Sequence, residues 1–214
     1  MPHPGLACLA QGPGGGSSAA AHWQESPRPV LVHATASVNV VKAACGTRHA
    51  ALISRAGELY TWGYGAVGSL GHGSLLSQAT PRRVEGRWVK SHESVVAAAS
   101  SDTCTAAVTS GGSLYTWGKG LGGQLGHGTA ALSCQPRLVT AFPQLGLRVM
   151  AVSCGAFHTA AITSDGALYT WGNGLAGKLG HGSHAAALLP RKVLALSSYV
   201  VSSVSCGWWH TAAV

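Results

Sequence analysis

Charged side chains are scarce in this 214-residue sequence, where Asp, Glu, Lys and Arg together make up only 9%. The acidic residues are fewest, and the whole chain has six: Glu25, Glu58, Glu85, Glu93, Asp102 and Asp165. Positioned carboxylates and histidines are the usual groups of general acid–base catalysis. So few acids leave little material for such chemistry, and the sequence predicts no enzyme and no catalytic residues.

Long apolar runs and targeting patterns are also missing. The sequence has no 18 consecutive apolar residues, which argues against a membrane-spanning helix. No basic segment precedes an apolar one near the start, so a secretory signal is not supported. Arginine is absent before Arg28, which weakens a transit-peptide interpretation. Residues 1–26, rich in Pro, Gly and Ala, are expected to form a disordered leader.

Closely spaced metal ligands are absent as well, since no Cys-x-x-Cys pair occurs, and no metal or cofactor is predicted. Six cysteines are present, and three of them share one position of a repeated phrase: Cys45, Cys154 and Cys206. Such cysteines are interpreted as small buried hydrophobes rather than disulfide partners. A reducing compartment, the cytosol or the nucleus, is therefore expected.

What the sequence has in abundance is repetition. The cleanest copy of the phrase comprises Cys154–Ile162, Ser164–Gly172 and Leu179–Gly182, and related copies precede it and begin again at Cys206. The tryptophans of Leu-Tyr-Thr-Trp-Gly fall at 62, 117 and 171. Self-similarity at a fixed period indicates stacked structural units that share a core.

The recurring positions are interpreted as structural rather than functional. Each tryptophan is expected to pack between neighbouring units, and the remaining positions to form turns and core contacts. These positions are Cys45, Gly46, His49, Trp62, Gly63, Trp117, Gly118, Cys154, Gly155, His158, Trp171, Gly172, Cys206, Gly207 and His210.

The phrase closely resembles the regulator-of-chromosome-condensation repeat, through Cys-Gly-x-x-His-Thr-Ala-Ala, Leu-Tyr-Thr-Trp-Gly and Gly-x-Leu-Gly-His-Gly. The resemblance covers roughly residues 27–214. It implies an all-β fold, a β-propeller of four-stranded antiparallel blades, usually seven in that family. About three and a half repeats are present here, so we expect a partial or truncated propeller.

The repeat boundaries follow from the phrase. Pro27–Leu31 matches Pro190–Leu194, so 27–44 is predicted to be the tail of a repeat. Full repeats are expected at 45–99, 100–153 and 154–205, and residues 206–214 start another. Because the chain starts and ends inside a repeat, we expect it to be a piece of a longer protein. The alternatives are that partial rings self-associate or that they end in capped edges.

Each copy is expected to contain four short strands. In the third copy they are predicted at 149–153, 158–163, 167–171 and 191–196. Asp165-Gly166 lies between the second and third of these strands, where a tight hairpin needs a positive φ. The second copy departs from the phrase at its start, with Ser100-Ser101-Asp102-Thr103-Cys104. We interpret it as a degenerate unit.

Two further patterns are assigned to structure. Each copy contains Gly-x-Gly-x-x-Gly, but no helical periodicity follows it, as nucleotide binding would require. The histidines recur at equivalent positions of different blades, so they are turned apart about the axis and form no metal site.

A basic pattern is the candidate binding feature. Arg82, Arg137 and Arg191 each follow the repeat tryptophan by 20 residues, which predicts equivalent places on successive blades. Arg83 and Lys192 are adjacent. The net charge is +8, which favours an acidic partner. The alternative is that each arginine is a solvated loop charge.

The sequence therefore predicts a non-enzymatic protein-interaction module that binds an acidic protein partner through its blade loops. The resemblance implies an alternative, guanine-nucleotide exchange on a small GTPase of the Ran type, with chromatin association. Direct DNA binding would lose affinity steeply with salt. No base-reading pattern supports it, so direct nucleic-acid binding is not expected.

Overall fold

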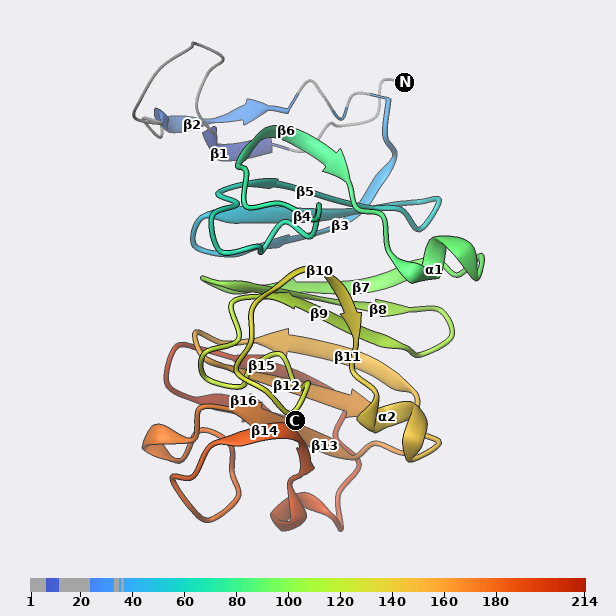
Figure 1. The fold of residues 1–214 in the computed structure, drawn as a ribbon, viewed down its shortest axis with the longest axis vertical. Helices are drawn as coiled ribbons and strands as arrows, with labels where there is room; N and C mark the ends of the chain where they lie inside the picture. The colour runs from blue at the N-terminus through green and yellow to red at the C-terminus, as the bar shows by residue number, and fades with distance from the viewer. Residues whose placement is uncertain (1–6, 12–23, 33–34, 36) are drawn as a thin grey trace.

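The computed structural model describes residues 7–11, 24–32, 35 and 37–214 (Figure 1). Two strands, β1 (Ala7–Gln11) and β2 (Gln24–Leu31), pair antiparallel at the N-terminal end of the structure. This strand pairing differs from the disordered leader expected for 1–26. Strand β2 contains the repeat-like segment that starts at Pro27, and β1 supplies its pairing partner. The remainder of that leader lies outside the described residues.

Three four-stranded antiparallel sheets follow, here called blades one, two and three. Blade one contains β3 (Val40–Cys45), β4 (His49–Ser54), β5 (Leu59–Gly63) and β6 (Gln78–Arg83). Blade two contains β7 (Val95–Ser100), β8 (Cys104–Thr109), β9 (Leu114–Gly118) and β10 (Ser133–Leu138). Blade three contains β11 (Val149–Cys154), β12 (His158–Thr163), β13 (Leu168–Gly172) and β14 (Ala187–Lys192).

The C-terminal residues form a two-stranded sheet of β15 (Val204–Cys206) and β16 (Thr211–Ala213). Short helical turns follow β6, β10 and β14: α1 (Arg87–Lys90), α2 (Ala141–Gln144) and the 3₁₀ turn η3 (Leu194–Leu196). Another 3₁₀ turn, η2 (Leu175–Gly177), follows β13. Among the described residues, no helix has the length and apolar character needed to cross a membrane.

The sheets stack face to face along the longest axis of the molecule, as Figure 1 shows. Strands β3, β7, β11 and β15 are the first of their sheets, and β7, β11 and β15 each lie next to the first strand of the preceding sheet. The sheets therefore converge at their first strands, as blades do at the axis of a propeller. The predicted all-β class of four-stranded antiparallel sheets is confirmed.

The core lies between the blades. The second and third strands are apolar on both faces, and every residue of β8, β9, β12 and β13 is buried. At the first junction, Trp88 of α1 packs edge-on against Tyr115, with ring centroids 5.0 Å apart. At the second, Phe142 of α2 packs against Tyr169 in the same way at 5.4 Å. Helices α1 and α2 thus each place one large apolar side chain over the next blade.

The fourth strand differs from its prediction in the third copy. It spans Ala187–Lys192, and residues 194–196, expected to be strand, form η3. The strand begins before Pro190 and includes it. A proline is tolerated here because β14 pairs only with β13 and leaves its other edge without a neighbour in the sheet.

The repeat phrase and the blade are offset along the chain. Cys45, Ser100 and Cys154 open the sequence repeats, but each is the last residue of the first strand of its blade. A sequence repeat therefore holds three strands of one blade and the first strand of the next.

Candidate interaction site

Each blade carries one of the three arginines, at the same position of its fourth strand. Arg82 pairs with Thr61, Arg137 with Thr116 and Arg191 with Thr170, in the same strand register. All three side chains are exposed. Together they form what we call the arginine arc: Arg82, Arg137 and Arg191.

A histidine lies beside each arginine of the arc. In blade one, the Thr61 hydroxyl donates to the Leu70 carbonyl at 2.6 Å, so it accepts from Nε2–H of His72 at 3.1 Å. Thr116 with His127, and Thr170 with His181, repeat this arrangement. The pairs fasten the Leu-Gly-His-Gly loop to the Thr of Leu-Tyr-Thr-Trp-Gly, which explains why both motifs recur together.

These histidines add no charge to the arc at neutral pH. Burial and, to a smaller extent, the positive charge of Arg137 lower the pKa of His127 to about 4. The pKa of His72 is also lowered, by burial and by the charge of Arg82. Burial and the charge of Arg191 lower the pKa of His181 in the same way. At this place each blade therefore presents the positive charge of the arginine guanidinium alone.

The arc arginines have no carboxylate partner among the side chains that the structure describes. Among the residues whose side chains are described, 32, 35 and 37–214, the ion pairs involve only Arg48 and Arg83. Arg83 lies 3.2 Å from Glu58 and 3.7 Å from Glu85, so it is already neutralised locally. Lys192 corresponds to Arg83 in blade three, and blade two has Leu138 there. The second basic position is therefore missing from blade two.

Neighbouring blades are joined by a second set of polar contacts. Trp117 Nε1 donates to the Ser69 carbonyl at 2.8 Å, and Trp171 Nε1 to the Gln124 carbonyl at 2.9 Å. Thr105 and Thr159 donate to the same two carbonyls, each at 2.8 Å. In both junctions the accepting carbonyl belongs to the earlier blade. The repeat tryptophans therefore hold blades together through their indole N–H as well as their apolar surface.

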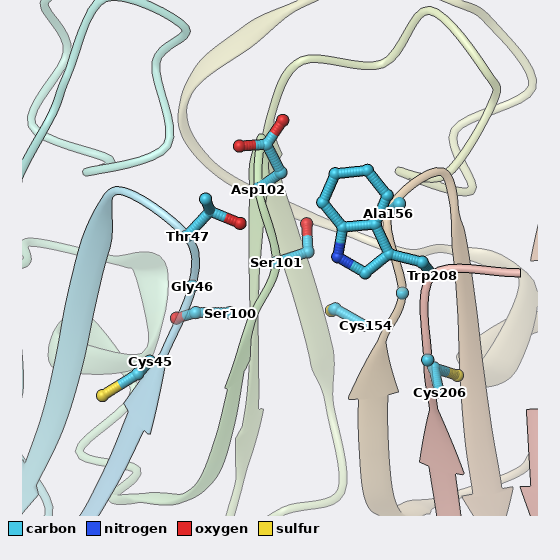
Figure 2. A pocket seen from close by; sticks show the side chains of 12 residues that line it. Cys45, Gly46, Thr47, Ser100, Ser101, Asp102, Cys154, Ala156, Cys206 and Trp208 are labelled. Atoms are coloured by element: carbon cyan, nitrogen blue, oxygen red, sulfur yellow. The ribbon is translucent and has the colours of Figure 1, made fainter.

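The turns between first and second strands surround an axial cavity of about 320 Å³ (Figure 2). Its lining residues are Cys45-Gly46-Thr47, Ser100-Ser101-Asp102, Cys154-Gly155-Ala156 and Cys206-Gly207-Trp208. A Cβ added at Gly46 would meet the Ser101 carbonyl oxygen, so only glycine permits the two turns to approach this closely. In the described residues, no group of three or more His, Cys, Asp or Glu is placed to hold a metal ion.

The second copy contributes polar groups to this cavity. Asp102 Oδ1 lies 3.6 Å from Arg48 Nε of blade one. Ser101 Oγ lies 3.1 Å from Cys104 Sγ. The departure of residues 100–104 from the repeat phrase, interpreted above as a degenerate unit, is the sequence signal for these polar groups.

The repeated cysteines do not share one environment. Cys154 is buried and Cys206 half-buried, as small hydrophobes would be, but Cys45 is exposed. The difference has a structural cause. Strand β8 of the preceding blade packs on β11, which ends at Cys154, whereas no complete blade precedes β3 among the described residues.

The sequence matches the family model of the regulator of chromosome condensation (RCC1) repeat at residues 56–108, 111–162 and 165–214. It is 37% identical over 195 residues to the ultraviolet-B receptor UVR8 of Arabidopsis thaliana, covering 89% of this chain and 42% of the receptor. It is 36% identical over 192 residues to the human E3 ubiquitin-protein ligase HERC2, covering 88% of this chain and 4% of the ligase.

A solved structure of Prp20p from Saccharomyces cerevisiae superposes with a TM-score of 0.74 at 19% identity, covering 88% of this chain and 45% of that one. The chain thus spans less than half the length of each of these proteins.

Proposed function

The chain belongs to the RCC1 repeat family, and we propose that it is a protein-interaction module that binds an acidic protein partner through the arginine arc. The observation that carries this proposal is the equivalent, exposed placement of three arginines that no carboxylate of the described residues neutralises. Three unpaired charges at a fixed spacing attract an acidic surface and orient it as it approaches.

Similar proteins support a protein partner. Prp20p has described binding properties towards Gsp1p and histones, and a second structure has yeast RCC1 (Prp20) bound to Kap60. A propeller-like stack is well suited to this role, because its rigid strands carry loops that are free to vary. The cytosol and the nucleus stay the predicted compartments.

Charge reversal of the arc tests the proposal. The probe is a fluorescent poly-glutamate peptide, whose binding is followed by anisotropy at low salt. We expect the triple variant R82E/R137E/R191E to bind at least about tenfold more weakly, because each reversal replaces an attraction by a repulsion.

The matched control is R55E/R87E/K90E, which changes the net charge equally at exposed residues outside the arc. It is expected to lose clearly less affinity than the arc variant. Equal losses in the two variants would mean that net charge alone attracts the probe, and would overturn the proposal.

Nucleotide exchange is the second candidate, and the binding properties of Prp20p towards Gsp1p favour testing it. The measurement is release of a fluorescent guanine nucleotide from a Ran-type GTPase with micromolar amounts of this chain. No acceleration would remove this candidate for the chain as given. A duplex DNA probe in the anisotropy assay separates a nucleic-acid partner from a protein one, since its binding should fall steeply with salt.

A further inference from the structure

The junction between blades two and three differs from its neighbours at two positions of the repeat phrase. Blades one and three carry cysteine at the first position and histidine at the fifth: Cys45 with His49, and Cys154 with His158. Blade two carries Ser100 at the first position and Cys104 at the fifth. The substitution places a thiol where the other blades have an imidazole.

The other junctions show what the fifth position faces. His49 Nε2 lies 2.7 Å from the Thr105 hydroxyl of the next blade, and His158 Nε2 lies 2.8 Å from that of Thr211. Each of these threonines is the cross-strand partner of a first-position residue, Ser100 for Thr105 and Cys206 for Thr211. A fifth-position side chain therefore lies against a cross-strand pair of the following blade, which consists of a threonine and the first-position residue.

At the middle junction the same geometry brings two thiols together. Cys154 is the cross-strand partner of Thr159, so Cys104 faces Cys154. Both residues are buried in the same hydrophobic cluster, and their thiols influence each other's ionisation across the junction. At the following junction Cys206 lies opposite His158 instead of a second thiol, and its own thiol donates to the Ser153 carbonyl.

The two thiols are chemically unequal. Hydrogen bonds from Cys154 and Ser101 stabilise the Cys104 thiolate and lower its pKa despite complete burial. The pKa of Cys154 is raised, first by its hydrogen bond to Cys104 and then by burial. The thiolate is the nucleophile, and the Ser101 hydroxyl, 3.1 Å from Cys104 Sγ, can stabilise it at Cys104. We therefore assign Cys104 as the attacking residue and Cys154 as the one that resolves the intermediate.

A small oxidant has a route to this pair. Ser101, whose hydroxyl contacts Cys104 Sγ, and Cys154 itself both line the axial cavity, as Figure 2 shows for their side chains. The cavity, of about 320 Å³, has room for hydrogen peroxide beside the two residues that flank Cys104.

We propose that Cys104 and Cys154 are a peroxide-sensitive dithiol that closes into a disulfide and ties blade two to blade three. Cys104 thiolate attacks one peroxide oxygen, the O–O bond breaks, and the product is a sulfenic acid and water after proton uptake. Cys154 sulfur then attacks the Cys104 sulfur, and the sulfenic oxygen leaves as a second water. In total, two thiols and one hydrogen peroxide give one disulfide and two waters.

Peptide mapping of the folded chain tests this directly. The chain is treated with hydrogen peroxide, remaining thiols are blocked with N-ethylmaleimide, and trypsin is added. Cleavage at Lys and Arg separates the two cysteines into peptides 91–119 and 149–178, and leaves Cys45, Cys134 and Cys206 in others. The expected product is 91–119 joined to 149–178, lighter by two hydrogens and released by dithiothreitol.

Matched variants show whether the pair is the cause. C104S and C154S should each abolish the linked peptide, and C206S should retain it, since Cys206 sits at the same repeat position as Cys154 but opposite a histidine. A linked peptide that forms equally well in C154S, or that joins other cysteines, would overturn the proposal. So would oxidation of Cys104 to sulfinic or sulfonic acid with no linkage in the folded wild-type chain.

Thermal unfolding gives a second readout. A disulfide that closes a loop of this length restricts the unfolded chain, so oxidised wild type should melt roughly 5 °C or more above its reduced form. C104S and C154S should show no such rise after the same treatment. An unchanged melting temperature in a fully cross-linked wild type would contradict the claim that the bond ties the blades.

Discussion

At the scale of single residues, the inter-blade histidines are held neutral by the surroundings of their second nitrogen. His49 and His158 use Nε2 for the threonine of the next blade. Their Nδ1 atoms are buried and have no hydrogen-bond partner. Protonation would add a buried N–H without an acceptor, which is costly. Burial accordingly lowers the pKa of both histidines to about 4.

This predicts that the fold loses stability on mild acidification. The unfolded chain binds protons at His49 near pH 6.5 and the folded chain only near 4, so stability is complete above pH 6.5 and falls between 6.5 and 4. The variant His49→Gln keeps a hydrogen-bond donor for Thr105. Between pH 7 and pH 5, its free energy of unfolding in urea should fall by about 2 kcal/mol less than that of wild type.

The control for this experiment is His184→Gln, because His184 is exposed on the loop before β14. It should keep the full pH dependence of wild type. If the free energy of unfolding of His49→Gln changed with pH as much as that of wild type, His49 would not be held neutral by the fold.

At the scale of elements, the second and third strands and the hairpin between them could be predicted from the sequence. Their apolar residues are continuous, and a glycine marks each turn at Gly57, Gly112 and Gly166 with positive φ. The fourth strand and the helical turn after it could not be placed. That strand is half exposed, contains a proline and has no apolar pattern of its own, because it forms one edge of the blade.

The hairpin turn of blade two also sets how closely blade three approaches. A Cβ at Gly112 would lie 2.6 Å from Cβ of Arg148, just before β11. Gly146 has a similar positive φ, with open space around it. Gly112→Ala should therefore destabilise the fold by about 1–3 kcal/mol more than Gly146→Ala, the difference being the cost of moving the blades apart. Urea unfolding of both variants measures it, and equal losses would mean that backbone strain alone is responsible.

At the scale of the whole molecule, stability depends on contacts between neighbouring blades. Blade two is packed on both faces, by blade one and by blade three, and every residue of β8 is buried. In β16, two of three residues are exposed. The number and order of the sheets were readable from the repeat, since each copy carries the same apolar strands. The proximity of Cys104 and Cys154 could not be predicted from the sequence, because it depends on which residues of adjacent copies face each other.

Hydrogen exchange followed by mass spectrometry should reveal this gradient. Amides of β8 are expected to exchange slowest and those of β16 fastest, because opening β8 requires two junctions to separate. Equal protection of the two strands would indicate that the stack unfolds as one unit from either end.

The shared carbonyls at the junctions give the stack a direction. Ser69 and Gln124 accept from the tryptophan and threonine of the blade that comes later in the chain. When the chain leaves the ribosome, the acceptor loop of a blade is therefore complete before the donor strands of the next blade emerge. Each finished blade can serve as the template on which the next one folds, so co-translational assembly proceeds vectorially from the N-terminal side.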